Sequence, residues 1–389
     1  MGPIEFNLFR LPQSANFAMN DRGMSAGDEL NYESTGLIVP TRWRSQQQQQ
    51  QSQSGGKLLG QGVYGCTFEP APRCAGGQVF SRIQGLPAVG KVTAENPTAE
   101  VAVGRAIMAL PLAQQYFALP TETCKPRLPV DDADVGKCEF LEESVAAGES
   151  ISMMVMPLAG RQLLQWSLDL PRLATNYRRL FIHLLEGMVI YQRAGYVHND
   201  IHMGNVLVDN AGVARYIDFG LAFKVDDVLT WEDANLGTTF KPQYVWQAPE
   251  VHLWRMLRNG IRVRDGVAKL KAENVELSQM EHQFPARPSL EMALSDLANT
   301  STSLRQKDGG GAFVRAYGKR FDAWRIGLCM WLLWQDLLAW SGFRQTELWS
   351  QRDLMRRVLG GLTQFNPRAR WTAEQALAAL DPRNRLAKA

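Results

Sequence analysis

The sequence predicts an α+β fold in which short strands come first and helices follow. Apolar runs bounded by glycine, proline and asparagine recur between residues 58 and 217, and the pattern beyond Glu250 is mostly helical. Hydrophobic residues make up 45% of the 389 residues, so the chain can bury a substantial core. This length suits one large domain or two modest ones.

Charge and hydropathy exclude several classes of protein. The chain has 42 basic and 39 acidic residues, a net charge of +3, which argues against a dedicated nucleic-acid or membrane-surface protein. No signal-peptide pattern opens the chain. The most apolar stretch, 324–340, contains Arg325 and Asp336 and is short for a membrane span, so we expect a buried helix. We expect neither a nucleic-acid nor a membrane partner, and the oligomeric state stays open.

The cysteines predict the redox environment. They are five in number, which is odd, and no CxxC pattern is present. We therefore expect solitary thiols and a reducing, intracellular compartment, with pairing or metal binding by Cys124 and Cys138 as the alternative.

The first 56 residues differ in composition from the rest. Residues 46–51 are an unbroken glutamine run, followed by serine, glutamine and glycine. Such a segment buries little apolar surface, so 1–56 is predicted to be a flexible Gln/Ser-rich tail. An inert linker is the plain interpretation, and a docking or aggregation role is the alternative.

Ordered elements are expected from Lys57 onward. Predicted strands cover 63–68, 88–94, 151–156, 206–208 and 214–217. Asn96-Pro97 is typical of a helix start, with Asn as N-cap and Pro as the first helical residue, and the helix continues to about 110. A second helix is predicted over 171–194.

A glycine cluster lies between the first strands. Gly60, Gly62 and Gly65 form G-x-G-x-x-G, a spacing that lets a backbone approach phosphate oxygens closely. A dinucleotide-binding turn needs a helix directly afterwards, whereas residues 66–68 continue as a strand. The pattern favours a strand–loop–strand phosphate lid, and a plain loop is the alternative.

Lys91 lies inside a predicted apolar strand, where a lysine is costly to bury without a partner. A phosphate and a helix carboxylate would supply one. Glu100 is the candidate carboxylate, although a solvated helix charge is the alternative because Glu100 falls early in its helix.

The strongest signal is the stretch YVHNDIHMGNVLV at 196–208, followed by YIDFG at 216–220. Asp200, Asn205 and Asp218 all carry oxygen ligands or acceptors. Hard oxygen ligands suit Mg²⁺, which neutralises phosphate charge.

With these residues the sequence resembles the protein kinase superfamily, whose catalytic loop reads H-R-D-L-x-x-x-N and is followed by D-F-G. The spacings from Asp200 to Asn205 and to Asp218 agree with that pattern. Later elements agree as well: A-P-E ends at Glu250, and D-x-W-x-x-G begins at Asp322, an aspartate that in the family braces the catalytic-loop backbone. A late arginine, Arg370, in the family pairs with the A-P-E glutamate.

The resemblance implies a two-lobed kinase-like fold. A small β-rich N-lobe would cover 57–158 and a larger helical C-lobe 159–389, with an insertion at about 251–321. The insertion carries a basic stripe, interpreted as a solvated helix face, with a docking surface for an acidic partner as the alternative. The stripe consists of Arg255, Arg258, Arg262, Arg264, Lys269 and Lys271. Thr372 with Gln375 predicts a capping box for the last helix.

The resemblance also implies the activity, which is transfer of the γ-phosphoryl group of ATP, with Mg²⁺, to Ser or Thr of a protein substrate. The three glycines would cover the phosphates, and Lys91, supported by Glu100, would hold the α and β phosphates. Asp200 would orient the hydroxyl, and Asn205 and Asp218 would bind Mg²⁺.

The adenine site is implied in the same way. Residues 155–160 are similar to the hinge between kinase lobes, with Met156 as gatekeeper. The Pro157 carbonyl and the Ala159 N–H would face the adenine. The positions expected to sandwich the adenine ring are Thr67, Val89 and Leu207.

Two residues depart from the family pattern. Asn199 replaces the H-R-D arginine that binds a phosphate on the activation segment, which predicts little dependence on phosphorylation there. Thr238 and Thr239 are therefore weaker candidates for switch sites. His202 replaces the lysine found two residues after the aspartate, and either a protonated or a neutral histidine is compatible with the sequence.

These departures keep other functions open. Asp-x-His loops also occur in small-molecule kinases, and a pseudokinase scaffold is the third possibility. The 251–321 insertion, the hinge and the catalytic loop together are similar to kinase-like proteins of large DNA viruses, which would place the chain in a host cytoplasm or a virion.

Overall fold

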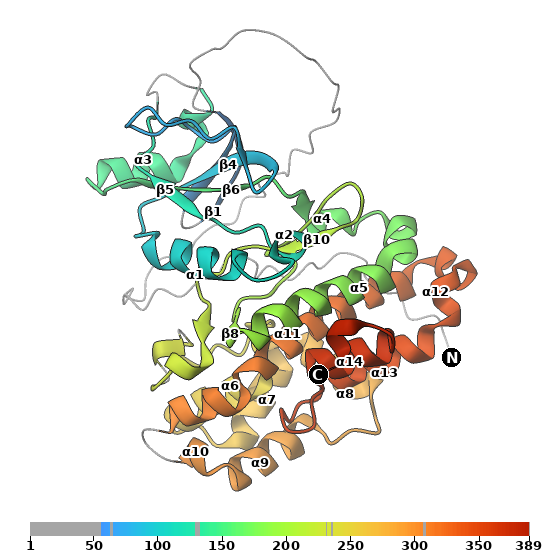
Figure 1. The fold of residues 1–389 in the computed structure, drawn as a ribbon. Helices are drawn as coiled ribbons and strands as arrows, with labels where there is room; N and C mark the ends of the chain where they lie inside the picture. Colours follow the sequence, from blue (N-terminus) through green and yellow to red (C-terminus); the bar gives the residue numbers. More distant parts are fainter. Residues whose placement is uncertain are drawn as a thin grey trace.

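The computed structural model describes residues 56–62, 65–128, 133–230, 232–234, 236–305 and 309–388. The predicted tail, apart from Gly56, lies outside the described residues, as do Val63 and Tyr64 of the glycine-rich loop. Figure 1 shows two lobes, a smaller one with the early strands in blue and teal and a larger helical one in green to red. The predicted two-lobed α+β, kinase-like fold is confirmed.

An antiparallel sheet in the order β1-β2-β4-β6-β5 forms the small lobe, with β3 paired to β4. Phe68, Val92 and Val155, one from each of three neighbouring strands, lie on the buried face of the sheet. They belong to a hydrophobic core that is separate from the core of the large lobe. The strands are β1 (Lys57–Gly62), β2 (Gly65–Glu69), β3 (Arg82–Ile83), β4 (Leu86–Thr93), β5 (Glu122–Cys124) and β6 (Ser152–Pro157). The predicted strands at 88–94 and 151–156 correspond to β4 and β6.

Helices α1 (Thr98–Met108) and α3 (Glu139–Ala146) lie beside this sheet, and η1 (Val135–Lys137) directly precedes α3 (Figure 1). Helix α2 (Ala113–Tyr116) instead packs against α5 (Leu170–Arg193) and β10 (Ala214–Tyr216) of the large lobe. Helix α1 begins one residue later than predicted, and Asn96 Oδ1 accepts the Thr98 N–H at 3.1 Å. The sequence pattern did not predict α2, α3 or β5.

Two disulfides cross-link the small lobe, so the prediction of solitary thiols is wrong for four of the five cysteines. Cys66 of β2 pairs with Cys138 at the start of α3, and Cys74 pairs with Cys124 of β5. The partners are 72 and 50 residues apart, so local spacing carried no sign of them. Cys329 is free and buried. The cysteines therefore no longer support a reducing compartment.

The pairing predicts one free thiol in the unreduced chain. Thiol titration in denaturant without reductant is expected to detect Cys329 alone, and prior reduction is expected to expose all five cysteines. Because each bridge closes a long loop, reduction should lower the free energy of unfolding by roughly 4 kcal/mol per bridge. Five reactive thiols before reduction would contradict the pairing.

Two small sheets of the large lobe are built from short strands. β7 (Arg161–Gln162), β9 (Val206–Val208) and β10 (Ala214–Tyr216) form one small sheet, and β8 (Tyr196–Val197) pairs with β11 (Phe223–Lys224). β9 and β10 match the predicted pair, and Gly212 with φ +79° lies in the turn between them. These strands hold the segment between α5 and α6 in place.

The large lobe is built on two long helices, α5 (Leu170–Arg193) and α11 (Gly310–Ala339). Asp169 caps α5 by accepting the Arg172 N–H, as expected for a helix with proline in its first turn. The predicted buried helix at 324–340 is the second half of α11, which begins at Gly310, well before Asp322. No helix in the described ranges is long and apolar enough to cross a membrane.

The remaining helices of the large lobe pack around this pair (Figure 1). They are α4 (Leu163–Trp166), η2 (Val225–Asp227), η3 (Glu232–Ala234), α6 (Pro249–Arg258), α7 (Val263–Glu273), α8 (Val275–Gln283), α9 (Leu290–Thr300), α10 (Thr302–Arg305), η4 (Ser341–Gln345), α12 (Glu347–Ser350), α13 (Arg352–Leu362), α14 (Ala373–Leu380) and η5 (Arg385–Ala387).

The basic stripe of segment 251–321 divides into two kinds of residue. Arg255 is 1% exposed and points into the protein, so it belongs neither to a solvated face nor to a docking surface. Arg262, Lys269 and Lys271 form ion pairs with nearby acidic residues of α7 and α8. Their charge is largely balanced locally, which favours the solvated-face interpretation.

Glu250 and Arg370 form a buried, bidentate ion pair, as the resemblance implied. The two Arg370 Nη atoms lie 2.6 and 2.7 Å from the Glu250 carboxylate oxygens, and both side chains are fully buried. The pair joins the start of α6 to the segment before α14. The capping box of Thr372 with Gln375 at the start of α14 is present as predicted.

Arg370→Met should leave the Glu250 carboxylate buried and unpaired. We expect the free energy of unfolding to fall by about 3–5 kcal/mol. Denaturant unfolding measures the loss. An exposed arginine of α13, Arg356→Met, is the control and should change stability little. Equal stability of the two variants would contradict the buried pair.

Candidate active site

The glycine-rich hairpin of β1 and β2 lies beside β4 in the same sheet. Gly65 has φ +149°, and a Cβ there would collide with the carbonyl oxygen of Val92, so this position accepts only glycine. In contrast, Gly60 and Gly62 have open space around them. The backbone at these two positions is therefore accessible to a ligand, whereas Gly65 is needed for strand packing.

Three charged side chains meet between the lobes, two from neighbouring elements of the small lobe and one from the large lobe. Lys91 of β4 places Nζ 3.5 Å from Asp218 Oδ2 and 4.0 Å from Glu100 Oε2 of α1. Gly220 N–H donates to Asp218 Oδ1 at 3.4 Å. Asp218 has φ +60°, a left-handed conformation that is strained for a non-glycine residue and is common at functional sites. The predicted Lys91–Glu100 pairing is present.

Burial and charge compete in this cluster. Burial raises the pKa of Glu100 to about 7, and Lys91 only partly opposes the rise. For Lys91, burial lowers the pKa, but Asp218 and Glu100 outweigh it and the pKa is raised. Burial raises the pKa of Asp218, but Lys91, His198, the Gly220 N–H and His202 together outweigh that effect and the pKa is lowered. Within the described chain, Glu100 Oε1 is buried without a hydrogen-bond partner. Desolvation therefore dominates at Glu100.

This raised pKa predicts how Glu100 affects stability across pH. The folded protein keeps a proton that the unfolded chain releases above about pH 4.5, so this contribution to stability is lost as pH rises through about 7. Relative to Glu100→Gln, the wild type should lose on the order of 3 kcal/mol of unfolding free energy between those pH values. Denaturant unfolding at several pH values measures it. A wild type that instead gains stability over this range would show that the pairing with Lys91 dominates.

Asp200 is the central carboxylate of the catalytic loop. Its Oδ2 accepts a hydrogen bond from Asn205 Nδ2 at 3.1 Å, and the same amide donates to the Asp200 carbonyl at 2.9 Å. Its Oδ1 accepts from the Tyr244 hydroxyl at 3.3 Å. The two predicted loop residues are therefore in direct contact, and the carboxylate is oriented from two sides.

His202 fits the neutral alternative. Burial lowers its pKa, although Asp200 opposes the effect. His202 Nδ1 accepts the Gly204 N–H at 3.0 Å, which a doubly protonated ring could not do. Nε2 lies 3.8 Å from Asp200 Oδ2. The ring also packs near Trp246, with centroids 5.9 Å apart.

Sequence reasoning missed Tyr244. It precedes the A-P-E element and approaches Asp200 only through the folded activation segment, the stretch between Asp218 and Glu250. Burial, followed by the negative charge of Asp200, raises the pKa of its hydroxyl, which stays protonated and donates. No motif marks the position, because nothing in the local sequence relates residue 244 to residue 200.

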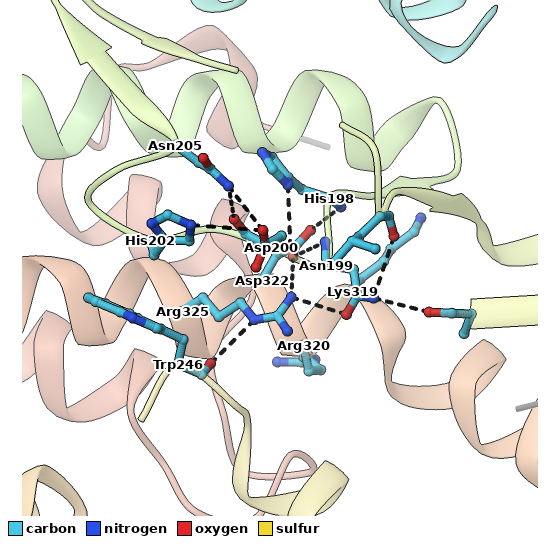
Figure 2. Close-up of polar contacts among 12 residues, drawn as sticks. His198, Asn199, Asp200, His202, Asn205, Trp246, Lys319, Arg320, Asp322 and Arg325 are labelled. Atoms are coloured by element: carbon cyan, nitrogen blue, oxygen red, sulfur yellow. Dashed lines mark hydrogen bonds and ion pairs between the residues drawn. The ribbon is translucent and has the colours of Figure 1, made fainter. Parts of the chain in front are cut away.

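The catalytic loop rests on α11 (Figure 2). Asp322 is fully buried, and its carboxylate accepts the His198 N–H at 2.7 Å and the Asn199 N–H at 3.0 Å. The Tyr191 hydroxyl donates to the same carboxylate at 2.9 Å. This is the bracing contact that the resemblance implied for Asp322, and it fixes the backbone just before Asp200.

Aromatic packing connects this loop to Asp218 and to the small lobe. The ring centroids of His198 and Phe219, the residue after Asp218, lie 4.2 Å apart. Phe219 packs edge-on against Phe117, which directly follows α2, at 6.0 Å. Apolar contact therefore fixes the two aspartate-bearing segments relative to each other.

The residues expected to hold a divalent cation present a suitable donor set. Asn205 uses Nδ2 for Asp200, and Figure 2 shows its oxygen pointing away from that residue. Asp218 supplies a carboxylate of lowered pKa. One amide and one carboxylate fit Mg²⁺, which keeps several waters or phosphate oxygens as ligands. No group of three or more His, Cys, Asp or Glu in the described residues forms a metal cluster.

The predicted adenine positions lie on adjacent strands. Val89 of β4 faces Met156 of β6 across the sheet, and Thr67 of β2 faces Lys91. After Pro157 the chain turns at Gly160, where a Cβ would collide with the backbone of Val208 in β9. β9 also carries Leu207, so the hinge packs directly against the strand that follows the catalytic loop.

Comparison with known proteins agrees with this geometry. Residues 144–258 match the family model described as protein tyrosine and serine/threonine kinase. Over this segment the chain is similar to the protein kinase superfamily. The match includes Asp200, Asn205, Asp218 and the A-P-E element. The glycine-rich hairpin, Lys91 and Asp322 lie outside it, so their assignment depends on sequence motif and geometry.

Similar proteins are kinases by name. The serine/threonine-protein kinase cst-1 of Caenorhabditis elegans is 34% identical over 67 residues, 17% of this chain and 12% of that protein. Mitogen-activated protein kinase kinase kinase 3 of Arabidopsis thaliana is 40% identical over 70 residues, 18% of this chain and 10% of that protein. Serine/threonine-protein kinase hippo of Drosophila melanogaster is 34% identical over 67 residues, 17% of this chain and 9% of that protein. The similarity spans about a tenth of the length of these relatives.

Proposed function

We propose that this protein is an active Ser/Thr protein kinase that transfers the γ-phosphoryl group of Mg-ATP to a hydroxyl of a protein substrate. The observation that carries the proposal is the Asp200 carboxylate, held by Asn205 and Tyr244, in a site that also has the Lys91–Glu100–Asp218 cluster. The Ser/Thr assignment is supported by the names of similar proteins.

In this proposal the nucleotide lies between a small lobe, 57–158, and a large lobe, 159–389. Met156, Pro157 and Ala159 of the hinge line the adenine, whose faces contact Thr67, Val89 and Leu207. The backbone of Gly60 and Gly62 covers the phosphates, supported by the open space around both glycines. Lys91, kept cationic by its two carboxylate neighbours, binds the α and β phosphates.

Asp200 positions the acceptor hydroxyl and accepts its proton as transfer proceeds. Its orientation by Asn205 and Tyr244 keeps a carboxylate oxygen directed at the substrate. His202, being neutral, stabilises this carboxylate by a polar contact rather than by charge. Phosphoryl transfer needs positioning and electrostatic stabilisation more than covalent participation by the protein.

Asn205 through Oδ1 and Asp218 through its carboxylate would hold Mg²⁺. When bound, the ion neutralises charge on the phosphate oxygens. Asp218 is suited to this role because its lowered pKa keeps it ionised. Its contact with Lys91 places the ligand for the cation beside the ligand for the phosphates.

A small-molecule kinase is the second candidate, and His202 is the observation that favours it. Protein kinases that act on Ser or Thr have a lysine at this position to steady the transferring phosphate, whereas a neutral histidine cannot supply that charge. A metabolite acceptor bearing its own cation would compensate.

Transfer of radiolabelled γ-phosphate decides between these functions. With generic protein acceptors, we expect label on Ser or Thr, and Asp200→Ala should abolish it. Label on free metabolites alone would support the small-molecule kinase. No turnover, with Mg-ATP still bound, would indicate a pseudokinase scaffold and overturn the proposal.

Two substitutions test the roles of the charged cluster. Asp218→Asn and Lys91→Met should each reduce kcat by roughly 100-fold or more, because one removes a metal ligand and the other a phosphate ligand. Steady-state kinetics with saturating acceptor measures the loss.

Matched controls come from exposed positions. Asp353→Asn and Lys269→Met make the same chemical changes on α13 and α7, at side chains that are mostly exposed. Both should retain wild-type turnover. Near-wild-type kcat in either cluster variant would refute the site assignment.

A further inference from the structure

A buried arginine lies directly beneath the catalytic loop. Arg325 of α11 is 1% exposed, and its Nη1 donates to Asn199 Oδ1 at 3.1 Å (Figure 2). Its Nε donates to the carbonyl oxygen of Trp246 at 3.3 Å. Its charge is balanced by Asp322, whose carboxylate lies 3.9 Å away. One side chain therefore links α11, the catalytic loop and the end of the activation segment.

Asn199 extends this link to the other end of the activation segment. Its Nδ2 donates to the Ala234 carbonyl at 3.0 Å and, more weakly, to the Leu221 carbonyl at 3.5 Å. Asn199 has φ +62°, which asparagine tolerates better than most residues. It is 2% exposed, so these contacts are shielded from water.

A second buried arginine acts on the same segment. Arg255 of α6 donates to the carbonyl oxygens of Leu236 and Gly237, the latter at 3.4 Å. The segment between Asp218 and Glu250 is thus held by hydrogen bonds to its own carbonyl oxygens. These backbone acceptors are present whether or not any residue of the segment is phosphorylated.

The charges explain why residue 199 is an asparagine. An arginine there would place another buried cation within contact distance of Arg325, and Asp322 balances only one of them. A neutral amide accepts from Arg325 and donates to the segment at the same time.

We propose that Asn199 and Arg325 are positioning residues that hold the activation segment in its transfer-competent arrangement, so that activity does not require phosphorylation of that segment. The inference rests on the proposed kinase activity. In this arrangement, a permanent internal contact between Arg325 and Asn199 takes the place of a regulated contact between an arginine and a phosphate.

Asn199→Gly is the sharpest test, because glycine adopts φ +62° without strain and only the amide is lost. We expect kcat to fall roughly 10- to 100-fold from misplacement of the segment. The Kd for Mg-ATP, measured by calorimetry, should stay within about twofold, because Lys91 and the hinge are untouched.

Asn274→Ala is the matched control. Asn274 is also a fully buried asparagine, but it caps α8 by accepting the Leu277 N–H at 3.0 Å, away from the catalytic loop. Its loss should cost about 1 kcal/mol of stability and leave kcat unchanged. A drop in kcat for Asn199→Gly but not for Asn274→Ala separates positioning from general destabilisation.

The phosphate requirement is tested on the full chain. Phosphatase-treated wild type, verified by mass spectrometry to carry no phosphate on 218–250, should keep its kcat within about twofold. Amide hydrogen exchange should show faster exchange over 221–246 in Asn199→Gly than in wild type.

Three results would overturn the inference: a tenfold or greater loss of wild-type kcat after dephosphorylation, wild-type kcat in Asn199→Gly, or unchanged exchange in that variant. A wild type that transfers no phosphate before or after phosphatase treatment would instead contradict the proposed function. In that case the exchange measurement still decides whether Asn199 holds the segment.

Discussion

The buried carboxylate of Asp322 holds the backbone of the catalytic loop, and the geometry of the site depends on that contact. Two backbone N–H groups and the Tyr191 hydroxyl donate to it in the absence of water, where such charge-assisted bonds are strong. Arg325 balances the negative charge and so offsets part of the free-energy cost of burying the carboxylate. Because the N–H groups belong to His198 and Asn199, Asp200 is placed by a helix that is distant in sequence.

In the Lys91–Glu100–Asp218 cluster, desolvation outweighs charge pairing at one of the three residues. At Glu100 the cost of burial exceeds the attraction of Lys91, and the pKa rises to about 7. The attraction between Lys91 and Glu100 therefore does not fully offset the burial of Glu100, and the closest charged contact of Lys91 in the cluster is with Asp218. Aromatic packing of His198, Phe219 and Phe117 relates this cluster to the catalytic loop without using charge. The apolar contacts fix the distance between the catalytic loop and the Asp218 segment, whereas the ionisable groups determine the charges at the site.

Sequence reasoning succeeded where a local pattern carries chemistry. The spacing of Asp200, Asn205 and Asp218, together with strands β4, β6, β9 and β10, followed from short motifs and apolar runs. It failed where the partner is remote. The cysteine pairs span 50 and 72 residues, α11 begins at a glycine run with no capping signal, and Arg255 looked like a surface charge. Periodicity reports which face of an element is apolar, but not what covers that face.

The sequence by itself indicated which residues we propose to act on phosphate and their order along the chain, because the motifs that carry them are short and local. Only the tertiary structure decided that Tyr244 meets Asp200, that His202 is neutral, and that Arg325 lies against Asn199. Each of these depends on desolvation and on contacts between elements dozens of residues apart or more. Burial is a property of the packed protein, so charge states and hydrogen-bond partners at the site emerged only with the fold.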